Sequence, residues 1–250
     1  MIILVDIGNS SIFFGLYDDN KIKKSFRLRT FTNKTCDEYF PLVNTFLVNE
    51  EFDDVIISSV VPVLTSAFSK LFLKYYNLKP MIIGPGIKSG VAIKVDEPKS
   101  VGSDLISDTA GISDNKSYII VDLGTATKYL YVKNKTLNGI VIAPGVVTSL
   151  NALVSSAALL PSIELQSPSK VLGKNTIACM QSGIIFGSAS QIDGMIDRIC
   201  EEINDNDVTL IATGGLSNLI IPHCKHHIII DEKLVLRGIL NIYYLNKQNK

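Results

Sequence analysis

The sequence predicts an α/β protein of two similar domains, each with a mixed sheet, and three observations support this. Residues 3–17 and 119–131 share one pattern: an apolar run, then Asp-x-Gly with small polar residues, then a second apolar run. A further β-rich stretch follows each copy, and helical and strand patterns then alternate. Strand triplets followed by such alternation are typical of mixed-sheet α/β domains. Two copies about 116 residues apart indicate duplicated domains rather than a solenoid.

The elements of the first half follow from the spacing of its apolar residues. Period-2 alternation with β-branched residues predicts strands, and apolar residues at helical spacing predict helices. In order, we expect a strand–turn–strand at 3–17, a strand at 21–28, a helix at 37–48, a strand at 55–59, a helix at 63–75 and a short strand at 81–83, ended by Gly84, Pro85 and Gly86.

The second half is interpreted in the same way. In order, we expect a strand–turn–strand at 119–131, a strand at 137–143, helices at 146–160 and 176–203, strands at 208–212 and 227–230, and a helix at 233–244. The polar stretch 113–117 has no periodicity, so the boundary between domains is expected there. The predicted domains are therefore 1–113 and 114–250.

Composition excludes several classes of protein. Of the 250 residues, 46 % are hydrophobic and 19 % charged, which is typical of a folded chain and not of a disordered one. The 24 basic and 24 acidic residues balance, and the few arginines are scattered. Binding of a nucleic-acid backbone needs a concentrated basic surface, so no nucleic-acid partner is expected.

Three features predict a cytoplasmic protein without a membrane partner. No apolar run approaches the roughly 20 residues that span a bilayer. The apolar stretch 1–5 meets Asp6 at once and lacks the basic lead of a secretory signal. The four cysteines show no paired spacing, so we expect free thiols.

The first Asp-x-Gly turn carries residues that suit phosphate. Gly8 lets an anion approach the backbone, where successive N–H groups and the Asn9 and Ser10 side chains can bind it. A carboxylate that ends a buried strand is costly unless a positive charge meets it, so Asp6 suits a hydrated Mg²⁺ carried by a nucleotide. The alternative is an ordinary hairpin whose aspartate caps its own turn.

Two further turns strengthen the phosphate interpretation. Asp122, Leu123, Gly124 and Thr125 repeat the first turn, and two such hairpins facing each other could bind a phosphate chain from both sides. A turn of small residues at 213–215 follows a predicted strand, at the carboxyl end where α/β sheets usually bind ligands. The alternative for this last turn is a loop that needs a positive φ.

Other polar residues are ambiguous from the sequence alone. Asp104 and Asp108 lie four apart on a predicted helical turn, and an exposed acidic face is the usual explanation for that spacing. Lys94 and Lys128 could contact phosphate, although lysines beside strands are mostly solvated.

An ordered set of motifs resembles one family. Asp-x-Gly-Asn-Ser at 6–10, Asp-x-Gly-Thr-Ala at 122–126 and Thr-Gly-Gly at 213–215 resemble the nucleotide-binding motifs of the superfamily of actin, hexokinase and heat-shock chaperones. The other matching stretches are Arg-Leu-Arg-Thr at 27–30, Asp-Glu-Tyr at 37–39, Ser-Ser-Val-Val-Pro at 58–62, Gly-Ser-Asp at 102–104, Ala-Pro-Gly at 143–145, Leu-Pro at 160–161, Gly-Lys-Asn-Thr at 173–176 and Met-Gln-Ser-Gly at 180–183. In order and spacing, over nearly the whole chain, they resemble the type III pantothenate kinases.

The resemblance implies a fold and an activity. The fold is two actin-like (ribonuclease H-like) α/β domains with mixed sheets and an inter-domain cleft. The activity is ATP-dependent phosphorylation of pantothenate at its primary hydroxyl to 4'-phosphopantothenate, the first step of coenzyme A biosynthesis. Such a transfer demands alignment, charge neutralisation and a base for the hydroxyl proton. The family pattern gives the role of general base to Asp104.

The resemblance also implies binding residues, metals and a partner. Asp6 binds Mg²⁺ through the nucleotide, Asp122 binds a monovalent cation, K⁺ or NH₄⁺, and the protein is a homodimer whose site is shared across the interface. ATP binding is implied for Asp6, Ile7, Gly8, Asn9, Ser10, Ser11, Ile12, Phe13 and Thr125. Pantothenate binding is implied for Val95, Gly102, Ser103, Asp104, Leu105 and, from the partner subunit, Thr176.

Two positions depart from the family pattern and leave the acceptor open. Leu105 stands where the family has arginine, and Val95 where it has tyrosine. Loss of a charge-assisted contact to a carboxylate costs roughly 1.5–3 kcal/mol. Either Lys94 or a partner lysine supplies the charge, or the acceptor lacks a carboxylate, as in a pantetheine kinase, or the protein is a non-catalytic nucleotide-binding regulator. A phosphate-chain hydrolase is a further alternative.

Overall fold

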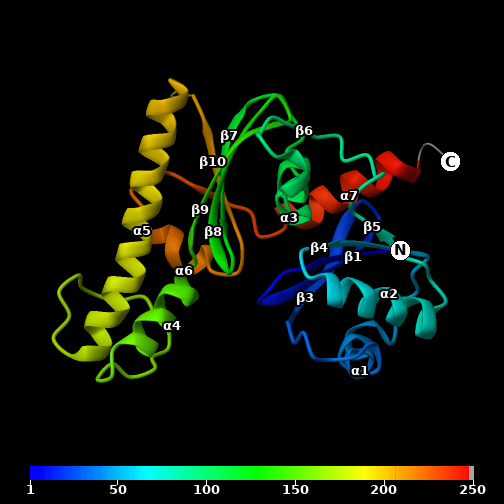
Figure 1. Ribbon diagram of the computed structural model, residues 1–250, viewed down its shortest axis with the longest axis horizontal. Helices are drawn as coiled ribbons and strands as arrows, with labels where there is room; N and C mark the ends of the chain where they lie inside the picture. The colour runs from blue at the N-terminus through cyan, green and yellow to red at the C-terminus, as the bar shows by residue number, and fades with distance from the viewer. Residues whose placement is uncertain (206, 248–250) are drawn as a thin grey trace. The chain divides into compact units, whose positions relative to one another are not determined.

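The computed structural model of the chain describes residues 1–205 and 207–247, which form two compact units (Figure 1). Unit 1 comprises residues 1–92, 96–113 and the described chain from 233 onward, and unit 2 comprises 93–95 and the described part of 114–232. The chain passes from unit 1 to unit 2 after residue 113, where the sequence places the domain boundary. The C-terminal helix, in contrast, belongs to unit 1, whereas the sequence assigned it to the second domain.

The sheet of unit 1 has the strand order β3-β2-β1-β4-β5. Its strands are β1 (Ile2–Ile7), β2 (Ser11–Asp18), β3 (Lys21–Arg29), β4 (Asp54–Ser59) and β5 (Met81–Ile82). β1 pairs antiparallel with β2 and parallel with β4, so the sheet is mixed, as predicted. The uninterrupted apolar run of β1 reflects its central position, since Ile3, Leu4 and Val5 are all fully buried.

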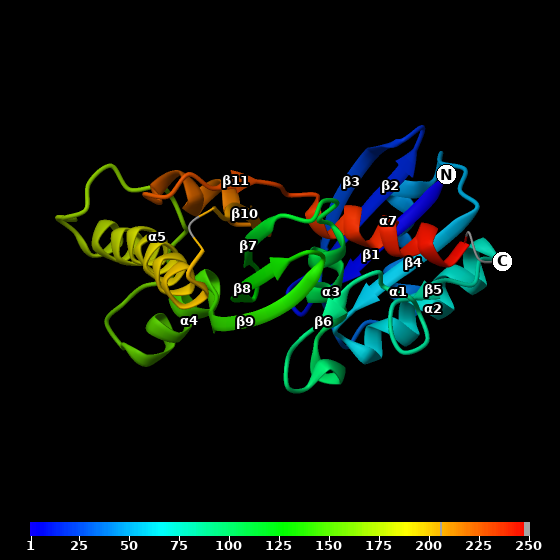
Figure 2. The same cartoon turned by 90° about the horizontal axis from the view of Figure 1, so that it is seen from above.

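Helices cover both faces of this sheet. On one face, α1 (Cys36–Leu47) and α2 (Pro62–Tyr76) pack a core that includes Phe14 and Phe68. On the other face, α3 (Ser103–Ala110) and α7 (Leu234–Lys247) pack against Leu4 and Ile56. Figure 2 shows α7 lying over the strands of unit 1. The apolar side of α7, with Leu236 fully buried, is therefore what places the C-terminal helix in unit 1.

Local sequence signals set the ends of α1 and α2. The Thr35 hydroxyl accepts a hydrogen bond from the Glu38 N–H, and the Glu38 carboxylate accepts one from the Thr35 N–H at 2.8 Å, which is a capping box. Pro62 opens α2, where its fixed φ suits the first turn. Asn77 ends the same helix with a left-handed φ of 55°. Both helices lie within one residue of their predicted bounds at each end.

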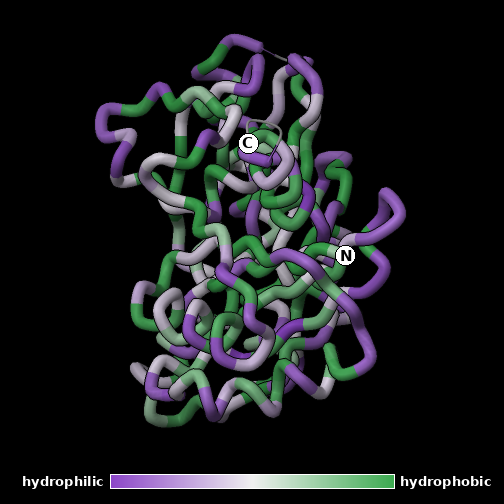
Figure 3. Tube along the Cα trace, turned by 90° about the vertical axis from the view of Figure 1, so that its right-hand side faces the viewer, coloured by the Kyte–Doolittle hydropathy of each residue, from purple (hydrophilic) through white to green (hydrophobic). Residues whose placement is uncertain are grey.

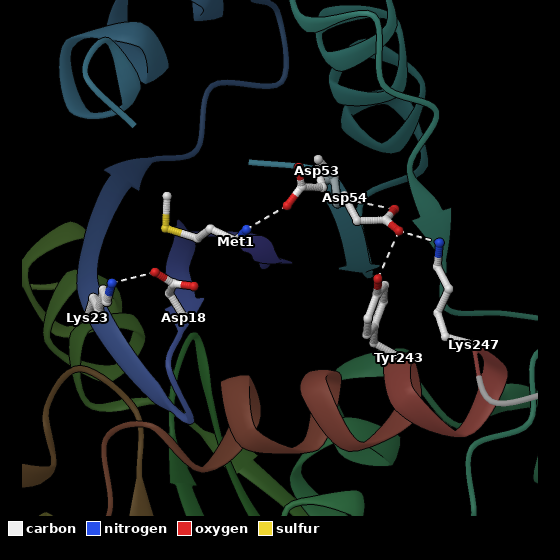
Figure 4. Close-up of polar contacts among 8 residues, drawn as sticks. Met1, Asp18, Lys23, Asp53, Asp54, Tyr243 and Lys247 are labelled. Atoms are coloured by element: carbon white, nitrogen blue, oxygen red, sulfur yellow. Dashed lines mark hydrogen bonds and ion pairs between the residues drawn. The ribbon is translucent and has the colours of Figure 1, made fainter. Parts of the chain in front are cut away.

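Asp54 ties α7 to the sheet at the start of β4 (Figure 4). Its carboxylate accepts a hydrogen bond from the Tyr243 hydroxyl at 2.8 Å and forms an ion pair with Lys247. Burial alone would raise the pKa of Asp54, but the Lys247 ammonium and the Tyr243 hydroxyl outweigh it and lower that pKa below its ordinary value. The neighbouring Asp53 pairs only with the Met1 amino group among the described residues, and its side chain is 89 % exposed.

We expect Asp54→Asn to lower the free energy of unfolding by about 1–2 kcal/mol at pH 7. The folded-state pKa lies below the unfolded-state value of about 4, so ionised Asp54 stabilises the fold above that pH. This stabilisation is lost as the pH falls through the folded-state pKa. Urea unfolding at pH 7 and under acidic conditions should show the gap between variant and parent closing. Asp53→Asn is the control, expected to change stability by less than about 0.5 kcal/mol, and an equal loss there would contradict the assignment.

The sheet of unit 2 repeats the strand order of the first sheet. Its order is β11-β10-β7-β8-β9-β6. β7 pairs antiparallel with β8 and parallel with β10, as β1 does with β2 and β4, so the sequence repeat is a structural duplication. The strands are β6 (Ala92–Ile93), β7 (Ser117–Leu123), β8 (Ala126–Lys133), β9 (Thr136–Pro144), β10 (Thr209–Thr213) and β11 (Ile229–Ile230).

A long helix covers one face of the second sheet. α5 (Thr176–Ile203) has the bounds that the sequence predicts, and it packs Ile185 and Ile192 against Val121 of β7 (Figure 1). Asn175 caps its first turn by accepting a hydrogen bond from the Ala178 N–H at 2.9 Å. The shorter helices of unit 2 are α4 (Val146–Ser156) and α6 (Ser217–Ile220), and short 3₁₀ turns lie at Pro98–Ser100 in unit 1 and Ile221–His223 in unit 2.

Some predicted elements are shorter in the structure. The helical pattern 146–160 ends as α4 at Ser156, and the predicted strand 227–230 is reduced to the two residues of β11. Leu159 is 94 % exposed, so apolar periodicity beyond α4 does not correspond to burial against this chain. β6 is an edge strand that the sequence did not predict.

No helix in residues 1–205 and 207–247 is both long and apolar enough to cross a membrane. Short hydrophobic and hydrophilic stretches follow each other along the chain in Figure 3. The four cysteines, Cys36, Cys179, Cys200 and Cys224, are free thiols, as predicted.

Candidate functional site

In unit 1, the β1–β2 hairpin presents backbone and small polar side chains at the carboxyl end of β1. The Gly8 N–H donates to the Ser11 carbonyl at 3.0 Å and closes the turn, leaving Asn9 and Ser10 exposed. Thr30, which follows β3, holds this turn from the side: its hydroxyl donates to the Gly8 carbonyl at 2.7 Å, and its N–H donates to the Ser10 carbonyl at 3.1 Å. The turn is therefore fixed before any ligand binds.

The apolar members of this hairpin contribute only backbone to a site. The side chains of Ile7 and Ile12 are fully buried, and that of Phe13 is 4 % exposed. Of the eight predicted ATP-binding positions in the hairpin, these three can therefore offer only N–H and C=O groups to a ligand. Asp6 is half-buried, and it is the register partner of Phe13 on β2 and of Ser58 on β4.

Ser103 brings Asp104 to the same end of the sheet. The Ser103 hydroxyl accepts a hydrogen bond from the Ser59 N–H at 2.9 Å and donates one to the Ser59 carbonyl at 3.0 Å. It also accepts one from the Ser58 hydroxyl at 3.2 Å. Because Ser58 is paired with Asp6 across the β1–β4 ladder, the start of α3 and the Asp6 turn are neighbours within unit 1.

The orientation of the Asp104 carboxylate is restricted. Its Oδ1 accepts a hydrogen bond from the Leu105 N–H at 2.9 Å. A Cβ added at Gly102 would lie 2.4 Å from this Oδ1 atom and 3.2 Å from Val60 Cγ1, so only glycine leaves room for the carboxylate where it stands. Gly102 therefore leaves room for the Asp104 carboxylate, and Ser103 anchors the start of α3 that carries it.

In unit 2, the β7–β8 hairpin presents the second Asp-x-Gly turn. The Gly124 N–H donates to the Ala126 carbonyl at 3.2 Å, and Thr125 is exposed at the turn. Asp122 is the register partner of Lys128, and the Lys128 ammonium lies 2.7 Å from Asp122 Oδ2. This aspartate is thus joined to a lysine, a contact that the sequence interpretation did not anticipate.

Two glycine-containing turns pack their bare backbone against this hairpin. Gly214 has a φ of 95°, and a Cβ there would lie 2.6 Å from the Leu123 carbonyl oxygen. A Cβ at Gly145 would lie 2.3 Å from the Thr125 carbonyl oxygen, and the Thr148 hydroxyl of α4 donates to that same carbonyl at 2.7 Å. The predicted third turn and the start of α4 therefore pack directly against the second hairpin, in a close approach of backbone to backbone that only glycine allows.

The remaining predicted site residues differ in how far they are buried and in the unit to which they belong. Leu105 is only 6 % exposed and packs into unit 1, whereas Val95 belongs to unit 2. Thr176 is exposed at the first position of α5. Asp108 is 2 % exposed, so the interpretation of Asp104 and Asp108 as an exposed acidic face is wrong: α3 turns Asp108 inward.

Sequence reasoning did not assign several residues that shape these turns. Thr30, Ser58, Ser59 and Gly145 were recognised as members of family motifs, but no role followed from their local sequence. The signal was their position: each follows or ends a predicted strand. Such residues gather at the carboxyl edge of a sheet, although the partner of each depends on the tertiary fold.

Comparison with known proteins identifies the family. The family model described as type III pantothenate kinase matches residues 2–198. The chain belongs to the type III pantothenate kinase family. It is 46 % identical to the type III pantothenate kinase of Acholeplasma laidlawii, over 98 % of this chain and 99 % of that protein. It is 40 % identical to the Exiguobacterium enzyme of the same name, over 99 % of this chain and 100 % of that one.

Solved structures confirm the fold of this pantothenate kinase family member as actin-like. A putative 2-dehydro-3-deoxygalactonokinase from Sinorhizobium meliloti is similar with a TM-score of 0.63 and 11 % identity, over 98 % of this chain and 96 % of that one. MreB 5 of Spiroplasma citri, bound to AMPPNP, is similar with a TM-score of 0.54 and 10 % identity, over 99 % and 97 %. The predicted α/β class with two mixed sheets is therefore confirmed.

Proposed function

We propose that this protein transfers the γ-phosphoryl group of ATP to the primary hydroxyl of pantothenate, giving 4'-phosphopantothenate and ADP in the first step of coenzyme A biosynthesis. The observation that carries the proposal is membership of the type III pantothenate kinase family over the length of the chain. The geometry within each unit supports it, because the predicted phosphate-binding turns are formed and Asp104 is fixed near Asp6 in unit 1.

The chain's own residues supply the parts that phosphoryl transfer needs. Asp104 takes the proton of the attacking hydroxyl, and the Leu105 N–H together with the room left by Gly102 holds its carboxylate in one orientation. The turn of unit 1 offers backbone N–H groups together with Asn9 and Ser10, and the turn of unit 2 offers Thr125. Positioning and charge neutralisation account for most catalysis of this kind.

Mg²⁺ fits the residues of the first hairpin. Asp6, half-buried at the carboxyl end of β1, offers a carboxylate, the hard oxygen donor that Mg²⁺ takes alongside nucleotide phosphates and water. When bound, the ion supplies charge neutralisation at the phosphoryl oxygens. For the second hairpin, the family resemblance assigns K⁺ or NH₄⁺ to Asp122. The Asp122 carboxylate, however, already forms an ion pair with the Lys128 ammonium.

Two substitutions relative to the family bear on the acceptor. Leu105 is buried in unit 1, so its side chain offers neither charge nor hydrogen bond to a carboxylate. Lys94 directly precedes Val95 in the sequence, after the short edge strand β6, and its side chain is exposed. It is therefore the first candidate for a lysine that supplies the positive charge. Pantetheine, which lacks the carboxylate, is the second candidate acceptor, and the apolar Leu105 and Val95 favour it.

The first experiment measures ADP release with ATP, Mg²⁺ and K⁺ in the presence of pantothenate, of pantetheine, or of neither. We expect turnover that depends on pantothenate. Turnover with pantetheine alone would make Leu105 and Val95 determinants of a changed acceptor specificity. Consumption of ATP without any acceptor would indicate a hydrolase. If folded protein binds ATP but releases no ADP with either acceptor, a non-catalytic regulator is the remaining interpretation.

We also propose a homodimer, with Thr176 contributed to the acceptor site of the partner subunit. The supporting observation is a group of exposed apolar side chains around α4, the segment after it and the start of α5. Its members are Val147, Leu153, Leu159, Val171, Leu172 and Ile177. Clustered exposed apolar residues are typical of association surfaces. Light scattering that gave the mass of a single 27.3 kDa chain would exclude the dimer.

We further propose a cytoplasmic location, with small molecules and not nucleic acid or membrane as partners. Free thiols, balanced charge and dispersed arginines support this location. Fractionation of cells that produce the protein would test it, and recovery with the membrane fraction would contradict it.

A further inference from the structure

Lys128 stands directly opposite Asp122 in the β7–β8 hairpin of unit 2. The strand register pairs the two residues, and the Lys128 ammonium lies 2.7 Å from Asp122 Oδ2. Both side chains are largely shielded from solvent, at 15 % and 14 % exposure. Directly opposed residues on antiparallel strands have Cβ atoms only about 4.5–5.5 Å apart. The sheet register therefore imposes this ion pair, which differs from a chance meeting of long side chains at the surface.

The pair places a positive charge on the carboxylate that the family pattern assigns to a monovalent cation. A lysine head group is itself a tethered ammonium ion with one charge and three donors. A free K⁺ or NH₄⁺ at the same carboxylate would lie beside this ammonium, at a distance where like charges repel and solvent screens them little. The residues at Asp122 therefore do not fit a free monovalent cation.

The first hairpin provides an internal comparison. At the position that matches Lys128, opposite Asp6, it carries Phe13, which has no charge. The two duplicated hairpins thus differ in the partner that their own second strand gives to the aspartate. In the second hairpin, the positive charge next to the aspartate belongs to a side chain of the hairpin itself, Lys128. In the first hairpin, any positive charge that neutralises Asp6 has to come from outside β2.

We propose that the Lys128 ammonium takes the place of the monovalent cation, so that phosphoryl transfer by this protein does not require K⁺ or NH₄⁺. The proposal rests on the proposed kinase function and deepens it. Lys128 acts as a positioning residue: it neutralises Asp122 and thereby holds the turn that carries Thr125. It also keeps a fixed positive charge beside that turn.

The wild-type protein provides the first test. ADP release with pantothenate and the affinity for a non-hydrolysable ATP analogue are measured in tetramethylammonium chloride, and then with K⁺ or NH₄⁺ replacing it at constant ionic strength. We expect either replacement to change both quantities less than about fivefold, below the usual range of effector coupling. A requirement for K⁺ or NH₄⁺, in turnover or in analogue affinity, would overturn the proposal.

Substitution provides the second test. Lys128→Met keeps an apolar stem and removes the charge; we expect turnover without K⁺ to fall about a hundredfold and added K⁺ or NH₄⁺ to restore part of it. Lys133→Met is the matched control, because Lys133 lies on the same strand, at the end away from the turn, and also pairs with a carboxylate, Asp205, at 3.0 Å. Full activity of Lys128→Met in tetramethylammonium would contradict the proposal.

The two proposals fail in different ways. If no acceptor supports turnover under any cation, the kinase function fails, while the dependence of analogue affinity on K⁺ still decides the role of Lys128. If Lys128→Met does not fold, the comparison of cations on the wild-type protein decides alone.

Discussion

Asp104→Asn is expected to lower kcat by about a hundred- to ten-thousandfold while leaving the affinity for an ATP analogue within about twofold. The amide has the size of the carboxylate and its oxygen can still accept the Leu105 N–H, so the local geometry of α3 is kept. It has no basicity at neutral pH, however, and cannot take the hydroxyl proton. The variant therefore removes the proposed chemistry without removing the binding site.

Steady-state ADP release and calorimetric titration of the analogue measure the two quantities separately. Asp19→Asn is the matched control, because Asp19 is an exposed aspartate in the β2–β3 turn, and its φ of 46° is one that asparagine adopts readily. Near-normal turnover by Asp104→Asn would show that another group acts as the base. Equal loss of binding and turnover would instead indicate that Asp104 is needed for the structure of the site.

Local signals explain why much of the fold was predictable. Asn175 caps α5, and buried isoleucines recur at helical spacing along it. Both the start and the period of this helix can therefore be predicted from residues close together in the sequence. The two hairpins were equally clear, because Asp-x-Gly interrupts apolar runs of strand length. The duplication extends to the topology, which the sequence did not predict: the two halves that begin alike fold into sheets of the same strand order.

Long-range packing explains what was missed. α7 is an amphipathic helix like any other in sequence, and only the fit of its apolar side onto β1 and β4 assigns it to unit 1. Asp108 shows the same limit on a smaller scale: the four-residue spacing from Asp104 is visible in the sequence, but the side of α3 that faces the sheet is not. Such choices depend on residues far away in the sequence.

The same difference between local sequence signals and long-range contacts applies to the candidate site. The turns at Asp6 and Asp122 were identified because glycine and small polar residues follow apolar strands. The pairing of Asp122 with Lys128 was not, although both residues were singled out, because it depends on the register of the hairpin. Thr30, Ser59 and Gly145 act through backbone contacts made by other elements, and no local pattern specifies such contacts.

Gly238→Ala is expected to destabilise the protein by at least about 2 kcal/mol, because α3 and α7 touch backbone to backbone in unit 1. A Cβ at Gly238 would lie 1.7 Å from the Ser107 carbonyl oxygen and 2.6 Å from its carbonyl carbon. A Cβ at Gly111 would in turn lie 2.6 Å from the Leu234 carbonyl oxygen. Alanine gains about 1 kcal/mol of helix propensity, but overpacking against backbone costs about 1–3 kcal/mol and often more where nothing can rotate away.

Urea unfolding measures this loss, and kcat should fall with it because α3 carries Asp104 and has to move away from α7. Gly194→Ala is the matched control: Gly194 lies inside α5, and a Cβ there would meet nothing within 4 Å. That variant should therefore gain about 0.5–1 kcal/mol from helix propensity alone, with unchanged kcat. Opposite signs for the same substitution in two helices would show that the close approach of α3 and α7, and not the propensity of the residue, decides the outcome. A stabilised Gly238→Ala variant would contradict the contact between these helices.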